Sequence, residues 1–220
     1  MGIAGRARTR AKITAVTGSV GKTSVKEAIA KLLSRQGSVS YSHGGLNNQY
    51  GVPLSLARLP KNTEFGVFEL GMNRAGELTD LSRMVRPLVA VVTTVELAHL
   101  EFFESKEEIA RAKAEIFGGL QNCGVAILNR DNFGYGILKK AAISVGANVV
   151  SFGFHQEADF KVNSWSKKIL TLNKTKPETS FGYHDGAVET VISVDDVNRR
   201  AQELAETISK EKIASLIQGE

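Results

Sequence analysis

The chain has 220 residues, of which 42% are hydrophobic, 23% charged and 7% aromatic, a composition typical of one large or two small globular domains. These values exclude intrinsic disorder and low-complexity repeats as descriptions of the whole chain. The 28 Lys and Arg residues outnumber the 23 Asp and Glu residues by five, but they form no long block, so we expect no nucleic-acid partner. The lone cysteine, Cys123, excludes an intramolecular disulfide and a multi-cysteine metal site.

The sequence gives no sign of a membrane span or a secretory leader. No apolar run approaches the ~18 residues that a spanning helix needs, and the N-terminal segment, which contains Arg6 and Arg8, lacks an apolar stretch of signal-peptide length. We therefore expect a cytoplasmic protein. Residues 1–11 are predicted to be a solvated, arginine-rich linker that leads into a domain over residues 12–220. The sequence leaves the oligomeric state open.

Strand and helix patterns alternate over the first two thirds of the chain. Short apolar or β-branched runs predict strands over residues 13–16, 65–70, 88–94, 125–128 and 148–152. Amphipathic or capped segments predict helices after Gly21 and over residues 78–85, 105–120 and 136–144. Strands separated by helices predict an α/β fold with a mostly parallel sheet and helices on both of its faces.

The pattern changes near residue 155. Short apolar segments joined by polar turns predict a small antiparallel β portion with strands over residues 160–165, 169–172, 180–183 and 188–193. From Asp195 onward, apolar residues recur at helical spacing, which predicts a charged, amphipathic C-terminal helix.

A glycine-bearing loop between the first strand and the first helix carries the strongest chemical signal. Its residues are Gly18, Ser19, Val20, Gly21, Lys22, Thr23 and Ser24. Glycines let backbone N–H groups wrap a phosphate, and the helix N-terminus adds partial positive charge, so the loop predicts a nucleotide site (a P-loop). Lys22 would neutralise phosphate charge and Thr23 would ligate Mg²⁺. The full pattern has glycine where this chain has Val16, so an ordinary strand-to-helix turn is the alternative.

Two further side chains are expected at the carboxyl edge of the sheet, where open α/β sheets bind ligands. Glu69 ends an apolar strand, where a carboxylate is costly unless it is paired or bound to metal. It could reach the same Mg²⁺ as Thr23, or it could simply point into water. His99 follows the strand over residues 88–94 by a few positions, but a lone histidine there is more often a surface or core residue than a ligand.

Three other segments are less informative by themselves. Lys113 lies within a predicted helix, and periodicity alone would place it in solvent. Asn47 and Asn48 form a polar turn before a proline-led segment. Asn129 and Asp131 follow a predicted strand, again at an edge where a nucleotide base could lie.

Taken together, these segments resemble the Mur ligase family of ATP-dependent amide ligases, which build the peptide stem of bacterial peptidoglycan. The matching segments follow the family's order and spacing, and they cover residues 16–24, 46–54, 69–77, 98–101, 112–117 and 128–131. Within the family, the Asn-Asn…Gly-Val-Pro-Leu segment over residues 46–54 resembles the members that join D-alanyl-D-alanine to UDP-N-acetylmuramoyl-tripeptide.

The resemblance implies an ATP site with two Mg²⁺ ions. The loop over residues 18–24 would bind the phosphates, Lys22 would contact the γ-phosphate, and Asn129 and Asp131 would lie on the adenine side. The implied metal ligands are Thr23, Glu69, His99 and Lys113, the last as a carbamate formed with CO₂. The resemblance thereby implies catalytic roles for Lys22, Lys113 and His99.

The resemblance also implies the reaction. A peptide carboxylate attacks the γ-phosphate of ATP to give an acyl phosphate, and the amine of D-alanyl-D-alanine then attacks the acyl carbon and releases phosphate. Two Mg²⁺ ions and Lys22 would screen the repulsion between the anions that meet in the first step. Asn47, Asn48 and Asn73 would face the UDP-muramoyl tripeptide.

Several features depart from the family. Glu96 and Asn132 stand where the family has Gly and Asp, and residues 155–220 match weakly. The family's N-terminal and C-terminal domains are absent from these residues, so we expect the central ATP-binding domain of such a ligase, unable to complete ligation alone. The alternatives are a related ligase such as folylpolyglutamate synthase, and a nucleotide-binding remnant without catalysis.

Overall fold

A parallel sheet organises the part of the chain that the computed structural model describes, residues 2–96 and 103–161. Within these ranges seven strands pair in the order β2-β3-β1-β4-β5-β6-β7, and each neighbouring pair is parallel. The strands are β1 (Lys12–Thr17), β2 (Val39–Tyr41), β3 (Phe65–Glu69), β4 (Val89–Val92), β5 (Val125–Asn129), β6 (Asn148–Gly153) and β7 (Phe160–Lys161). The five predicted strands are confirmed, and β2 is an additional short strand that the sequence did not predict.

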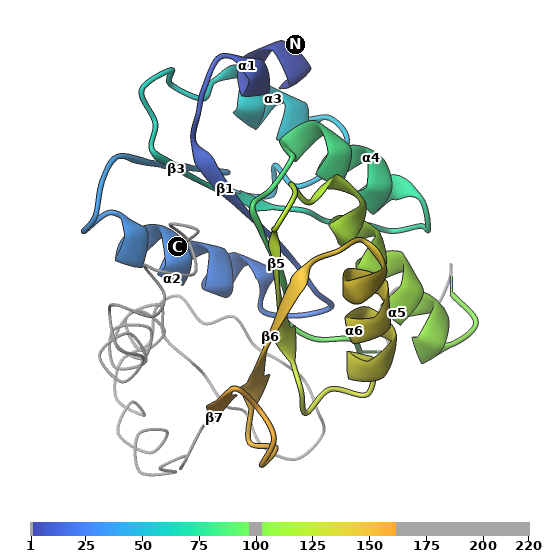
Figure 1. The fold of residues 1–220 in the computed structure, drawn as a ribbon. Helices are drawn as coiled ribbons and strands as arrows, with labels where there is room; N and C mark the ends of the chain where they lie inside the picture. The colour runs from blue at the N-terminus through green and yellow to red at the C-terminus, as the bar shows by residue number, and fades with distance from the viewer. Residues whose placement is uncertain (1, 97–102, 162–220) are drawn as a thin grey trace, which may run out of the picture.

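Helices cover both faces of this sheet, as predicted (Figure 1). One face carries α2 (Lys22–Leu33), and the other carries α3 (Gly51–Ala57), α4 (Glu77–Val85), α5 (Lys106–Ala114) and α6 (Tyr135–Ser144). The apolar core is divided accordingly. On β1, Ile13 and Ala15 belong to the larger cluster under α3 to α6, whereas Val16 belongs to the cluster under α2. None of the described helices is long and apolar enough to cross a membrane.

The predicted helix over residues 105–120 is divided in two. Ser105 caps α5 as expected, since its hydroxyl accepts a hydrogen bond from Glu108 N. The α-helix ends at Ala114, and Glu115–Gly119 continue as a 3-10 turn, η1. Ser82 of α4 donates its hydroxyl to the carbonyl of Ile116 and accepts from Gly119 N. These two backbone groups therefore bond to Ser82 and not to α-helical partners, which explains why the segment winds more tightly.

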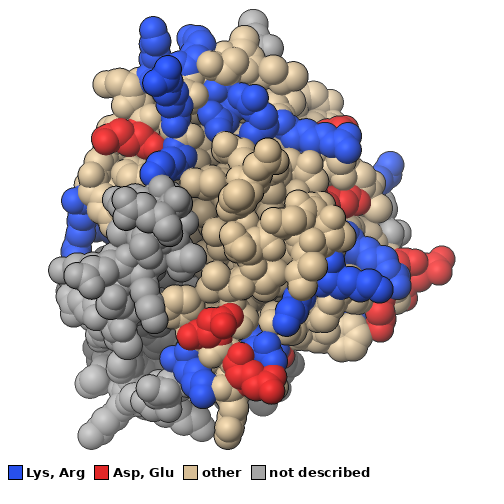
Figure 2. Space-filling model, in the orientation of Figure 1, with Lys and Arg blue, Asp and Glu red and all other residues tan. Residues whose placement is uncertain are grey.

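The arginine-rich N-terminal segment is not a solvated linker. Gly2–Ala7 form a short helix, α1, that packs on α3, and a Cβ on Gly5 would lie 2.2 Å from the carbonyl oxygen of Leu56. Arg6 is only 6% exposed, and its guanidinium donates to the carbonyl oxygens of Val85 and Arg86. The guanidinium therefore caps the C-terminus of α4, where a cation is favourable. In the view of Figure 2, Lys and Arg side chains form separate groups with uncharged surface between them.

The antiparallel portion predicted after residue 155 is described only at its start. Phe160 and Lys161 form β7, which pairs parallel to β6, so the antiparallel prediction is wrong for these two residues. The carboxylate of Asp159 accepts hydrogen bonds from Ser151 N and Oγ, which fixes the returning chain beside β6. The other predicted strands and the C-terminal helix lie outside the described residues.

Candidate functional site

The glycine-bearing loop lies at the carboxyl edge of the sheet, between β1 and α2. Gly18 has φ 151° and Gly21 has φ 80°, conformations that favour glycine. A Cβ on Gly18 would lie 1.9 Å from Thr93 Oγ1, so a side chain there is excluded. Val16, at the position where the full phosphate-loop pattern has glycine, is buried in β1 beside Glu69 of β3.

Two threonines that follow β4 fix this loop. Thr93 Oγ1 donates to the carbonyl of Val20 at 2.6 Å, and Thr94 accepts from Val20 N at its hydroxyl and from Ser19 N at its carbonyl. The hydroxyl of Ser19 also bonds both the N–H and the carbonyl of Glu96. From the sequence, Thr93 and Thr94 were expected only as the last residues of a strand. Two hydroxyl side chains in a row at the end of β4, the strand next to β1, could have indicated that these residues bond to the loop.

The start of α2 offers an anion site. Its N-cap is Gly21, which has no side chain to cap the first N–H groups of the helix. Lys22 Nζ lies over the loop and donates to the carbonyls of Gly18 at 2.8 Å and Ser19 at 3.3 Å. Burial lowers the pKa of Lys22, and the negative charge of Glu69 opposes that shift. These groups give the loop the donors and the positive charge that a phosphate requires.

Glu69 is paired, so the alternative that it points into water is wrong. Its side chain is buried at 3% exposure, and Oε2 accepts from Thr23 Oγ1 at 2.8 Å while Oε1 accepts from Asn47 Nδ2 at 2.8 Å. A hydroxyl and a carboxylate in contact are the hard oxygen ligands that Mg²⁺ prefers, so this donor set fits the ion. Among the described residues there is no group of three or more His, Cys, Asp and Glu that could hold a metal, and His99 lies outside them.

Lys113 is buried at 2% exposure, which contradicts the expectation from helical periodicity. Burial lowers its pKa from 10.5 to about 7, and the nearby charge of Lys22 adds to the shift. The electrostatic effect of Lys22 shows that α5 brings Lys113 near the loop. At neutral pH a substantial fraction of Lys113 is therefore the neutral, nucleophilic amine.

A cavity of about 600 Å³ adjoins this site. Asn48 and Asn73, two of the residues expected to contact substrate, both line it, together with Gly71 and residues along α4. Asn48 Oδ1 also accepts from the N–H groups of Tyr50 and Gly51 at the start of α3. Asn47 does not line the cavity. Its carbonyl accepts from Gly71 N while its side chain contacts Glu69, so it joins the cavity wall to the carboxylate.

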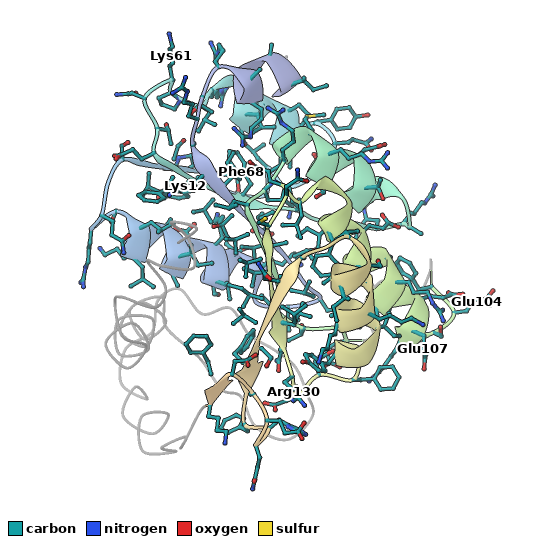
Figure 3. The ribbon with its side chains drawn as sticks, viewed as in Figure 1. Lys12, Lys61, Phe68, Glu104, Glu107 and Arg130 are labelled. Carbon is teal, nitrogen blue, oxygen red and sulfur yellow. The ribbon has the colours of Figure 1, made fainter. Side chains whose placement is uncertain are left out.

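Asn129 and Asp131 lie at the carboxyl edge of β5, as predicted. Asn129 Oδ1 accepts from Asp131 N, and the two carboxylate oxygens of Asp131 accept from the N–H groups of Phe154 and His155. These bonds tie the ends of β5 and β6 together. Figure 3 shows the neighbouring Arg130 at this end of the sheet, with Lys12 at the start of β1 toward the opposite end.

The family model for the Mur ligase middle domain matches residues 16–195, and the chain therefore belongs to the Mur ligase family. The UDP-N-acetylmuramoyl-tripeptide--D-alanyl-D-alanine ligase of Rickettsia prowazekii is 43% identical over 161 residues, which cover 71% of this chain and 35% of the relative.

Solved structures of such ligases agree with this assignment. MurF from Acinetobacter baumannii is 37% identical with a TM-score of 0.66, over 69% of this chain and 33% of that one. MurF ligase from Thermotoga maritima in complex with ADP is 32% identical with a TM-score of 0.64, over 70% and 35% of the two chains. The chain thus spans about a third of the length of these relatives.

Proposed function

We propose that this chain is the ATP-binding part of a ligase that joins D-alanyl-D-alanine to UDP-N-acetylmuramoyl-tripeptide in peptidoglycan synthesis. The observation that carries the proposal is the contact between Thr23 and Glu69 beside the uncapped start of α2. The names of the relatives and the ADP in the Thermotoga maritima complex support it. Because the reaction consumes ATP, we place it in the cytoplasm.

In this proposal the loop over residues 18–24 binds the phosphates of ATP. The first N–H groups of α2 donate to phosphate oxygens, and Lys22 exchanges the carbonyls of Gly18 and Ser19 for the γ-phosphate. Asn129 and Asp131 form the edge on the adenine side. Since the Asp131 carboxylate already accepts hydrogen bonds from two backbone N–H groups, Asp131 would position the backbone at that edge and would not contact the base directly.

The proposed metal ligands are Thr23 and Glu69 for one Mg²⁺, and His99 with carbamylated Lys113 for a second. The ions supply charge neutralisation where the peptide carboxylate approaches the γ-phosphate. Lys113 becomes an anion when its neutral amine adds to the carbon of CO₂ and loses a proton. Its lowered pKa of about 7 favours this step, since only the neutral amine carries the lone pair that forms the N–C bond.

The proposed substrate residues are Asn47, Asn48 and Asn73, which face the UDP-muramoyl tripeptide. The cavity that Asn48 and Asn73 line supports this role for both residues, and the contact between Asn47 and Glu69 would couple the substrate to the metal. The tripeptide carboxylate attacks the γ-phosphate, and D-alanyl-D-alanine then displaces phosphate from the acyl phosphate. We expect this chain alone not to complete ligation, because it spans about a third of the length of the relatives.

A substrate titration in the presence of Mg-ATP tests the proposal against its alternatives. We expect UDP-N-acetylmuramoyl-tripeptide to bind, a folate-type acid not to bind, and Asn73→Ala to weaken the muramoyl binding. Asn73 holds the turn before α4 through its backbone N–H to Glu77, so its side chain can be removed without loss of that bond. Preference for the folate-type acid would instead indicate a related ligase. Binding of ATP with neither acid would indicate a nucleotide-binding remnant.

A further inference from the structure

We propose that Lys26 is a positioning residue, which holds the chain segment behind Glu69 against α2 so that Glu69 meets Thr23. This inference rests on the proposed function, because its consequence is the geometry of the Mg²⁺ ligands. Neither the glycine-loop pattern nor the implied ligand set includes Lys26.

Lys26 is among the largest fully buried side chains of the described residues, with 0% exposure. Its ammonium group donates to the carbonyl of Ser42 at 2.7 Å, lies 2.9 Å from Glu27 Oε1 and 5.6 Å from the centre of the Tyr41 ring. A buried charge is costly unless such partners compensate it. The burial of a lysine here, rather than an apolar side chain, therefore indicates that the contacts with residues 41–42 matter.

Ser42 connects Lys26 to the site. It follows β2 directly, is 1% exposed, and is joined to β3 by the bond from its N–H to the carbonyl of Val67. Its carbonyl accepts from Lys26, and its hydroxyl accepts from the backbone N–H of Glu69 at 3.1 Å. One residue thus contacts both the ammonium group of α2 and the backbone from which the Glu69 side chain extends.

The two contact points on α2 are one turn apart. Thr23 and Lys26 are separated by three positions, so their side chains lie on neighbouring parts of one helix face. Thr23 contacts the carboxylate of Glu69 directly, whereas Lys26 holds Ser42, which holds the Glu69 backbone. With Lys26 removed, the polar contacts described between α2 and the Ser42–Glu69 region would be reduced to the one at the carboxylate, and the carbonyl of Ser42 would lose its charged partner.

The test measures ATP binding to the full chain by calorimetry, with and without Mg²⁺. We expect Lys26→Met to weaken binding about tenfold when Mg²⁺ is present, the low end for residues that orient metal ligands. Binding without Mg²⁺ should not change, because the loop amides and Lys22 are untouched. Lys26→Arg should recover part of the loss. Lys31→Met, at an exposed lysine of the same helix, is the control and should match the wild type.

Ser42→Ala provides a second variant, which carries the test if Lys26→Met does not fold. It removes the acceptor of Glu69 N and leaves the carbonyl that Lys26 contacts, so we expect the same Mg²⁺-specific loss. Equal affinities for variant and wild type would overturn the inference, and so would an equal loss with and without Mg²⁺, which a merely structural role predicts.

Glu69→Gln separates this inference from the proposed function. If the wild type binds Mg-ATP and Glu69→Gln weakens it while Lys26→Met and Ser42→Ala do not, only the role of Lys26 is wrong. If the wild type does not bind ATP, or Glu69→Gln has no effect, the proposed function fails and this inference fails with it.

Discussion

Thr23, in the first turn of α2, donates its hydroxyl to Glu69 Oε2 at 2.8 Å although the two residues are 46 positions apart in the sequence. The parallel order of the sheet makes this contact possible, because β1 and β3 are neighbours whose carboxyl ends meet at one edge. The helix that follows β1 therefore starts beside the residue that ends β3. The contact unites the glycine loop and the buried carboxylate in one site.

Glu69→Gln should weaken Mg-dependent ATP binding by about tenfold or more, since it removes the anionic ligand while it keeps the volume and an acceptor for Thr23. The thermal midpoint should fall modestly, because the amide NH₂ of glutamine cannot accept the bond that Asn47 donates to the second oxygen. Calorimetric titration at several Mg²⁺ concentrations measures the effect. Glu104→Gln, at an exposed carboxylate before α5, is the matched control (Figure 3). An unchanged Mg²⁺ dependence in Glu69→Gln would contradict the assignment of this residue.

The stability of the protein should rise with pH because of Lys113. Its pKa is about 7 in the folded state and 10.5 ordinarily, so between these values the unfolded state binds more protons and the free energy of unfolding increases with pH. Lys113→Met should remove this increase. Urea denaturation from pH 6 to 10 in CO₂-free buffer measures it, with the exposed Lys140→Met as control. A pH dependence that persists unchanged in Lys113→Met would show that other groups cause it.

Gly18→Ala should abolish ATP binding and destabilise the protein by about 1–3 kcal/mol, because the new Cβ meets Thr93 Oγ1 at a backbone conformation that suits glycine. The loop would have to leave the threonines that fix it. Gly136→Ala is the control, since no atom lies within 4 Å of a Cβ built there. Nucleotide titration of both variants measures the loss of binding, and thermal denaturation measures the loss of stability. Wild-type affinity in Gly18→Ala would show that the loop does not need its observed conformation.

Ser105→Ala should lower the free energy of unfolding by about 1 kcal/mol, the usual effect of losing an N-cap. The lost bond is the one that Ser105 Oγ accepts from Glu108 N at the start of α5, the helix that carries Lys113. Urea denaturation measures the change. Ser144→Ala, at an exposed serine whose hydroxyl bonds only the preceding turn of α6, should cost less. Equal effects of the two substitutions would contradict a specific role for the cap.

The fold was predictable where local patterns determine it. Runs such as residues 65–70 and 125–128 are apolar on both faces because the sheet is covered on both sides, and Ser105 marks a helix start by its chemistry alone. The glycine loop was predictable because Gly18 and Gly21 satisfy a backbone requirement that few sequences meet. The place of Glu69 at the end of an apolar strand indicated that residue, whereas only the family resemblance pointed to Lys113.

The remainder depends on contacts between distant segments. The strand β2 is three residues long and half buried, so it lacks the pattern of a central strand. The burial of Lys113 and Lys26 is set by elements packed over them. Ala30 and Leu33 share the buried face with Lys26, so their spacing could have indicated that position. Arg6 likewise belongs to a charged run, and only the end of α4 explains its burial.

The central claim is that the Gly18–Thr23 loop binds Mg-ATP, and calorimetric titration of ATP with Mg²⁺ into the wild type and Lys22→Ala tests it most directly. Lys22 is the cation of the loop and donates to its carbonyls at 2.8 and 3.3 Å. We predict a saturable heat for the wild type and a heat near that of dilution for Lys22→Ala. Equal heats for the two proteins would contradict the account.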